Sequence, residues 1–176
     1  KQARIKKDEI PNGWSIESAD CINRLLQRKG YSFNSSADFE MAREIKEKFC
    51  FISSDIEGER ELERTTTYYN SYYLLPDGSR VHISNEKFEA PEVLFNPSLL
   101  GKEYLGVPEM IDKSINNCPI DCRVGLYESI LLSGANTLFP GFAARLLDEM
   151  KQIYKNHLKI NLLYILQLFL FLFLLT

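Results

Sequence analysis

The stretch Ile130-Leu131-Leu132-Ser133-Gly134-Ala135-Asn136-Thr137-Leu138-Phe139-Pro140-Gly141 carries the pattern on which the fold prediction rests. Its apolar beginning is too short for a helix and is bounded by Ser and Gly, which predicts a buried strand. Small residues at 133–135 permit a sharp turn, and a helix is predicted over 142–154 from the spacing of Phe142, Leu146, Met150 and Ile153. Such a strand, loop and helix start can hold a nucleotide. On this pattern alone, however, an ordinary αβ turn explains the residues better.

The composition is that of a folded domain with an unusual C-terminal end. The chain has 176 residues, a length sufficient to bury a core. Of these residues 45% are apolar and 26% are charged, which is typical of a folded soluble protein. Its net charge of −3 argues against nucleic-acid binding. The four cysteines form no CxxC pair and the two histidines stand alone, so we expect no zinc site. Because no apolar export segment is seen, reduced cytosolic thiols are expected.

Two helices are predicted in the first 50 residues. Residues 1–15 are polar and broken by Pro11-Asn12-Gly13, which predicts an irregular lead-in. Ser15 or Ser18 can cap a helix that ends at Gly30, where glycine supplies a stop. A second helix, capped by one of the serines at 35 and 36, reaches about residue 50. Its buried stripe is expected at Ala37, Met41, Ile45 and Phe49.

Three polar residues of the second helix, Arg43, Lys46 and Glu47, share a patch away from that stripe because of their i, i+3 and i+4 spacing. Two interpretations of the patch stay open. Spacing alone favours a solvated face with weak ion pairs. The sharper interpretation is a polar cluster that grips the ribose and base of a nucleotide.

Short elements are predicted between the second helix and residue 101. Residues 53–70 show no firm period, so a flexible connector is expected there. A hairpin is predicted over 72–83 around the turn Pro76-Asp77-Gly78. One or two helical turns broken at Pro91 should follow. The loop 95–101 then exposes apolar residues, which indicates a contact surface.

Two more helices are predicted before the strand at residue 130. Pro108 suits the first turn of a helix whose inward residues are Val107, Ile111 and Ile115. The next helix follows Pro119, and its inward residues are expected to be Ile120, Val124 and Tyr127.

An apolar tail follows, and from Leu162 to Leu175 only Tyr164 and Gln167 interrupt Leu, Ile and Phe. As a helix it would span about 21 Å, short of the roughly 30 Å hydrocarbon core of a membrane. Three interpretations stay open: a short tail anchor, a buried core segment, or sequence foreign to the domain, such as translated intron. We favour the third and expect no membrane association.

A series of sequence blocks, in their order and spacing, resembles actin and the actin-related proteins over about Ala19 to Ile160. The blocks at 35–40 and 73–79 lean toward a divergent actin-related protein rather than conventional actin. The blocks that carry the resemblance are Arg28-Lys29-Gly30-Tyr31-Ser32-Phe33, Arg43-Glu44-Ile45-Lys46-Glu47-Lys48-Phe49-Cys50, Leu75-Pro76-Asp77-Gly78, Asn85-Glu86-Lys87-Phe88, Pro91-Glu92-Val93-Leu94-Phe95, Pro97-Ser98-Leu99-Leu100-Gly101 and Leu132-Ser133-Gly134-Ala135.

The resemblance implies an α/β fold of the actin-like ATPase (ribonuclease H-like) type, present in part as the small outer subdomain plus part of the large subdomain. This partial domain is expected over 16–160, after the lead-in at 1–15, with the tail at 161–176 outside the match. Residues matching positions that contact the adenine and ribose of ATP are Arg43, Lys46 and Glu47. Residues matching the loop on the other side of the adenine are Gly134, Ala135, Leu138 and Phe139. The family usually has glycine where Ala135 stands.

The resemblance also implies ATP or ADP with Mg²⁺ in the intact fold, and actin or actin-related subunits and actin-binding proteins as partners, in the cytoplasm and cytoskeleton. Residues 95–106 match the loop that projects an apolar tip between strands of actin filaments. The family's phosphate loops and metal-binding acidic residues are not recognisable in the chain, so catalysis by this chain alone is not expected. The alternative function is a non-catalytic interaction module that uses the Phe95 loop to join an actin-like assembly.

Overall fold

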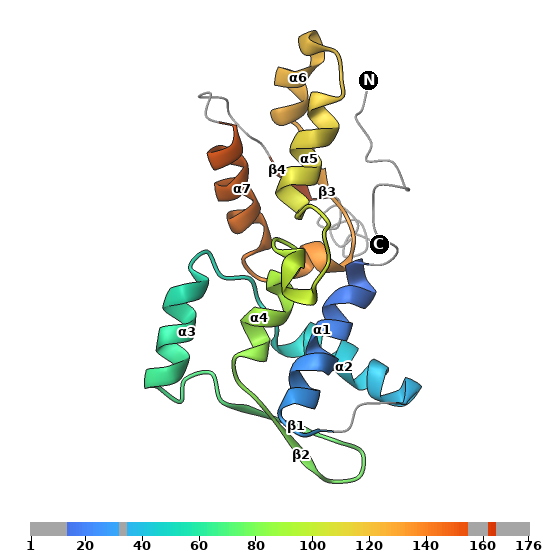
Figure 1. Cartoon of the computed structure of the whole chain (residues 1–176), viewed down its shortest axis with the longest axis vertical. Helices are drawn as coiled ribbons and strands as arrows, with labels where there is room; N and C mark the ends of the chain where they lie inside the picture. Colours follow the sequence, from blue (N-terminus) through green and yellow to red (C-terminus); the bar gives the residue numbers. More distant parts are fainter. Residues whose placement is uncertain (1–13, 32–34, 155–161, 165–176) are drawn as a thin grey trace, which may run out of the picture.

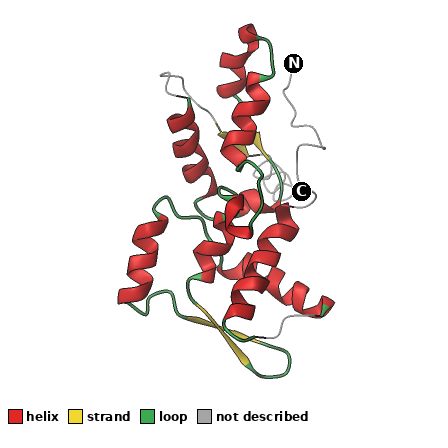
Figure 2. Cartoon of the chain, viewed as in Figure 1, coloured by secondary structure: helices red, strands yellow, loops and turns green. Residues whose placement is uncertain are grey.

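Helices form most of the described part of the chain, and the two small sheets found there lie in different halves of it (Figures 1 and 2). The computed structural model describes residues 14–31, 35–154 and 162–164. The outer lobe contains α1 (Trp14–Arg28), α2 (Ser36–Phe49), α3 (Ile56–Thr65), β1 (Ser71–Leu74), β2 (Arg80–Ile83) and α4 (Glu86–Glu92). The inner lobe contains η1 (Pro97–Leu100), α5 (Val107–Asn116), α6 (Ile120–Tyr127), β3 (Ile130–Leu132), η2 (Ala135–Leu138), α7 (Phe142–Ile153) and β4 (Leu162–Tyr164).

The outer lobe is organised around α1, which packs against both α2 and α4. Ile22 and Leu26 of α1 share one buried core with Ile45 of α2. An ion pair adds to the contact with α4, because Nζ of the partly exposed Lys29 lies 2.6 Å from a carboxylate oxygen of the buried Glu86. The packing of α1 on two helices therefore sets the shape of this lobe.

The predicted hairpin and the predicted cap of the second helix are both confirmed. Strands β1 and β2 pair antiparallel, with Ser71 opposite Ile83 and Leu74 opposite Arg80. The N-cap of α2 is Ser35, whose hydroxyl accepts a hydrogen bond from the Asp38 N–H at 3.2 Å. The predicted cap of α1 at Ser15 or Ser18 is wrong, since that helix already begins at Trp14.

The predicted flexible connector at 53–70 is wrong, because it contains α3. The Asp55 side chain caps this helix by accepting the Gly58 N–H at 3.0 Å. Polar contacts hold α3 in place: Glu59 accepts from the Ser53 hydroxyl at 3.1 Å, and Arg60 lies 3.4 Å from Glu89 of α4. None of the residues of α3 is buried, so a search for apolar periodicity could not find it.

The predicted break at Pro91 is also wrong, because α4 continues through this proline to Glu92. Proline has no N–H, so the carbonyl of Lys87, four residues earlier, lacks its usual helical partner. The N–H of Phe51 donates to that carbonyl at 3.0 Å. The proline thus frees an acceptor that fastens the segment after α2 to α4.

The inward faces of two helices differ from the prediction. In α2 the buried residues are Ala42, Ile45 and Lys46, whereas Ala37 is exposed. In α6 Tyr127 is buried, but Ile120 and Val124 are exposed. The reason in α6 is that, among the described elements, its main contact is with α5 alone.

The predicted strand and helix on either side of the loop at 133–141 are confirmed as β3 and α7. Phe142, Leu146 and Met150 of α7 are buried, as their spacing predicted. Strand β3 pairs in parallel with β4, which places Ile130 opposite Leu162. Residues 162–164 of the apolar tail thus form a strand, and the rest of the tail, 165–176, lies outside the described residues. In the described part of the chain, no helix has the length and apolar character needed to cross a membrane.

Candidate functional site

Two glycines with positive φ shape the loop between β3 and α7. Gly134 has φ +116° and Gly141 has φ +86°, angles that side-chain-bearing residues rarely adopt. A Cβ added at Gly134 would meet nothing within 4 Å, so only the backbone angle requires glycine there. Between them the turn η2 is closed by Thr137, whose N–H and hydroxyl both donate to the Gly134 carbonyl, at 3.1 and 2.7 Å.

The end of the loop is fixed against the segment that follows α2. The N–H of Ile52 donates to the Pro140 carbonyl at 2.8 Å. A Cβ added at Gly141 would lie 2.0 Å from the Ile52 carbonyl oxygen, so the two backbones are in direct contact. This contact brings the C-terminal end of α2 beside the loop, although the two are about 90 residues apart in sequence.

Lys46 connects α2 to the same loop with its side chain. It is only 2% exposed, and its Nζ donates to the side-chain oxygen of Asn136 at 3.4 Å. The ammonium also lies 6.0 Å from the centroid of the Phe139 ring. Burial lowers the pKa of Lys46, and the neighbouring Glu47 carboxylate opposes that shift. The structure therefore joins two of the predicted site residues, Lys46 and Phe139.

Arg43 and Glu47 remain on the solvent side of α2. Their side chains form an ion pair at 3.1 Å and are each more than half exposed. The solvated-face interpretation thus describes these two residues, whereas Lys46 departs from it through its burial. An exposed carboxylate held by a neighbouring guanidinium can still accept hydrogen bonds from a ligand hydroxyl.

The other predicted residues of the loop also differ in their exposure to solvent. Ala135 and Leu138 are exposed, and Leu138 offers an apolar surface to solvent, while Phe139 is buried beneath the loop. Asn136 was not predicted as a site residue. Only its position inside the small-residue loop could have drawn attention to it, because its partner is 90 residues away.

The side chains that this site exposes can bind a ligand through hydrogen bonds and apolar contact. The exposed surface of the loop and α2 consists of the Arg43–Glu47 ion pair and the apolar side chains of Ala135 and Leu138, which suit a sugar and a base, whereas Lys46 is buried beneath it. In the described residues, no group of three or more His, Cys, Asp or Glu side chains could hold a metal ion. The Mg²⁺ that the resemblance implies therefore has no ligand set among these residues, and we assign none.

The class of protein to which this strand, glycine-bent loop and facing helix belong follows from a comparison of the whole chain with known families. The actin family model matches residues 2–165, so the chain belongs to the actin family. This match confirms the predicted actin-like ATPase fold. The matched region is longer at both ends than the predicted region of resemblance, residues 19–160.

The chain is also similar to individual actin-related proteins. It is 47% identical over 131 residues to actin-related protein 2 of Acanthamoeba castellanii, an alignment that covers 74% of this chain and 34% of that protein. For actin-related protein 2 of Caenorhabditis briggsae the identity is 45% over 131 residues, with 74% and 33% covered. For that of Saccharomyces cerevisiae it is 44% over 130 residues, with 74% and 33% covered. The predicted resemblance to actin-related proteins is confirmed, and the chain spans about a third of the length of these relatives.

Proposed function

We propose that this chain supplies the adenine and ribose side of the nucleotide cleft in an actin-like, ATP-binding protein of the cytoskeleton and cytoplasm. One observation carries the proposal: the buried Lys46 crosses from α2 to Asn136 and so draws the helix against the loop after β3. Membership of the actin family supports it, because the resemblance assigns base and ribose contacts to both elements.

In this proposal the residues of α2 contact the ribose, and the residues of the loop contact the base. Glu47 can accept hydrogen bonds from the ribose hydroxyls, and Arg43 orients its carboxylate from one turn away. Ala135 and Leu138 offer the exposed small and apolar surface that a base can cover. When bound in the intact fold, Mg²⁺ would neutralise charge on the phosphates of ATP or ADP. We therefore assign to this chain contacts with the base and the ribose, and none with the phosphates.

We expect the full chain to bind adenosine and ATP about equally, with an affinity in the millimolar range or weaker, about −4 kcal/mol. Glu47→Gln should weaken both, because it removes the charged acceptor for the ribose, whereas hydrolysis of ATP should be absent. The matched control is Glu40→Gln, an exposed carboxylate on the same helix that also lies near Arg43, at 3.8 Å. Chemical-shift titration by NMR measures the affinities, and phosphate release measures hydrolysis. ATP binding hundreds of times tighter than adenosine would contradict the proposal.

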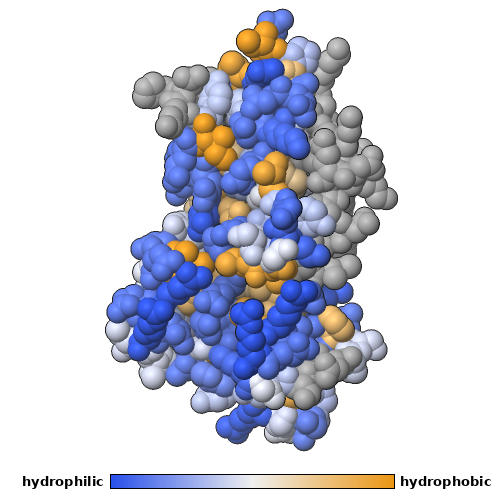
Figure 3. Space-filling view, viewed as in Figure 1, coloured by the Kyte–Doolittle hydropathy of each residue, from blue (hydrophilic) through white to orange (hydrophobic). Residues whose placement is uncertain are grey.

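We also propose that the loop 95–106 contacts a neighbouring actin or actin-related subunit. Leu99, Tyr104 and Leu105 are each more than 40% exposed, while Phe95 anchors the loop against Phe142 with ring centroids 5.7 Å apart. Figure 3 shows a largely hydrophilic face with apolar patches, one of them across the middle of the molecule. Co-sedimentation with actin filaments, reduced by a Leu99→Ser and Tyr104→Ser double variant, tests this contact. Unchanged co-sedimentation of the variant would contradict it.

A further inference from the structure

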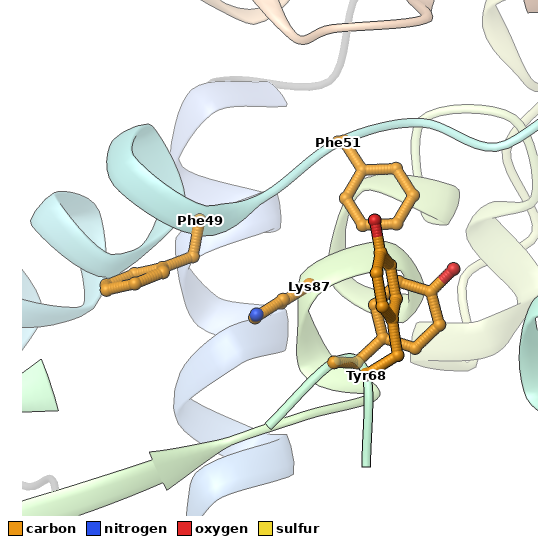
Figure 4. Close-up of a pocket in the computed structure, with 5 residues that line it drawn as sticks. Phe49, Phe51, Tyr68 and Lys87 are labelled. Carbon is orange, nitrogen blue, oxygen red and sulfur yellow. The ribbon is translucent and has the colours of Figure 1, made fainter. Parts of the chain in front are cut away.

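A separate pocket of about 380 Å³ lies in the outer lobe, and none of the predicted nucleotide residues lines it. Its walls come from the end of α2, the segment after it, the loop between α3 and β1, and α4. The lining residues are Phe49, Phe51, Tyr68, Tyr69 and Lys87 (Figure 4). Its size is at the lower end of the range for small-molecule sites, about 300–1,000 Å³.

Aromatic rings on one side of the pocket hold each other in place. Phe51 stacks on Tyr69 with centroids 5.9 Å apart, and Tyr69 meets Phe88 edge to face at 5.6 Å. The hydroxyl of Tyr69 is bonded to the Glu59 carboxylate, so its polar end is already satisfied. Tyr68 packs edge to face on Tyr69 but is 78% exposed, which leaves one of its faces to solvent at the mouth of the pocket.

Lys87 is the cation of this pocket. Its Nζ donates to the Ser71 hydroxyl at 2.8 Å and lies 5.8 Å from the centroid of the Phe49 ring. In Figure 4 the ammonium is directed toward Phe49, with Phe51 and Tyr68 on the other side of the lysine. Among the residues that the structure describes, no Asp or Glu forms an ion pair with it.

Lys48, in the same lobe, differs from Lys87 in having a carboxylate partner. It also lies over an aromatic ring, 5.5 Å from the centroid of Tyr73, but it forms an ion pair with Glu44 at 3.2 Å. Lys87 lies over the ring of Phe49 but has no carboxylate partner among the described residues. Since an ammonium carries three donors and Ser71 takes one, Lys87 can bind an anion that enters the pocket. Partial burial, which also lowers the pKa of Lys87, strengthens any such ion pair.

We propose that this pocket binds a small carboxylate with a planar aromatic body. The ring would lie against Phe51 and Tyr68, and the carboxylate would pair with Lys87, whose side chain would turn its ammonium from Phe49 toward the ligand. Aromatic walls favour a flat aromatic ligand, because ring pairs add edge-to-face and offset contacts to the burial of apolar area. A single cation matches the single charge of a carboxylate better than the double charge of a phosphate group.

The test uses the full chain and three probes: 1-naphthylacetate, its neutral analogue 1-naphthylacetamide, and acetate. Saturation-transfer NMR and chemical-shift titration should show saturable binding of 1-naphthylacetate. The amide should bind at least 5-fold more weakly and acetate should not bind measurably. Lys87→Met should reduce 1-naphthylacetate binding to the level of the amide, while the matched control Lys48→Met leaves it unchanged.

Tyr68→Ala keeps the proposal testable if Lys87→Met disturbs the fold, because an exposed ring can be removed without exposing the core. It should weaken 1-naphthylacetate binding about 3-fold, with an unchanged circular dichroism spectrum. Equal binding of acid and amide would overturn the proposal, as would equal losses in Lys48→Met and Lys87→Met. Absence of saturable binding at millimolar 1-naphthylacetate would also overturn it.

Discussion

Replacement of Gly141 by Ala is expected to lower the free energy of unfolding by about 3 kcal/mol or more. Two costs coincide at this position. The backbone angle φ of +86° costs a residue with a side chain about 1–2 kcal/mol. The new Cβ would also lie 2.0 Å from the Ile52 carbonyl oxygen, and a backbone atom cannot move aside as a flexible side chain can. The segment after α2 must therefore shift, and the Ile52–Pro140 hydrogen bond weakens with it.

Alanine variants of two other glycines serve as controls, because each has only one of the two costs. Gly134→Ala adds only the strain of a positive φ, because nothing lies within 4 Å of the new Cβ, so about 1–2 kcal/mol is expected. Gly106 has φ −65°, which any residue adopts, but its Cβ would lie 2.2 Å from the Phe95 carbonyl oxygen. Gly106→Ala therefore reports the steric cost alone. Urea unfolding followed by circular dichroism measures all three, and a Gly141→Ala variant no less stable than Gly134→Ala would contradict the prediction.

Local sequence signals predicted the elements in which one short pattern is sufficient. The strand and helix around the loop at 133–141 have the buried faces that their apolar spacing indicated, and Ser35 caps α2 as its residue type suggested. The helix α3 was missed because Asp55, Glu59 and Arg60 hold it through polar contacts, and the sequence alone shows such residues only as charges. In α6 the face was misjudged because apolar residues there remain exposed.

In the candidate site, too, contacts within one element could be predicted from the sequence, and contacts between distant segments could not. The Arg43–Glu47 ion pair follows from i, i+4 spacing within one helix. The bond from Lys46 to Asn136 joins residues 90 positions apart, so it depends on how α2 docks beside the loop. Burial of Lys46 could not be read from a charged residue on a polar patch, since lysine is usually exposed. The roles of these residues came from the resemblance, and the geometry supplied the contact between them.

A buried network around Arg145 joins α7 of the inner lobe to the outer lobe. Its guanidinium donates to the Ser53 carbonyl at 2.6 Å and lies 3.0 Å from Glu92 at the end of α4 and 2.8 Å from Glu149. It also lies 5.1 Å from the centroid of the Phe95 ring. The side chains of Arg145 and Glu92 are 13% and 9% exposed, so neither charge has much access to water.

Arg145→Met is expected to lower the free energy of unfolding at pH 7.5 by about 3–5 kcal/mol, because it leaves the buried Glu92 without its counter-charge. Burial raises the pKa of Glu92, and Arg145 opposes that shift. Without the guanidinium the native pKa of Glu92 should rise further. A carboxyl whose native pKa lies above its unfolded value contributes stability at low pH and loses it as the pH rises through the native pKa. The deficit relative to the parent chain should therefore be larger at pH 7.5 than at pH 5.

Two further variants identify the buried carboxylate as the cause. Adding Glu92→Gln to Arg145→Met should recover part of the loss at pH 7.5 and remove most of the pH dependence, since a neutral amide replaces the unpaired charge. Lys151→Met, on the same helix, removes an exposed ion pair with Asp148 at 3.8 Å and should cost less than about 1 kcal/mol at either pH. Urea unfolding at both pH values measures the four chains. A deficit for Arg145→Met that is the same at pH 5 and pH 7.5, and unchanged by Glu92→Gln, would assign the loss to packing over Phe95 instead of to the carboxylate.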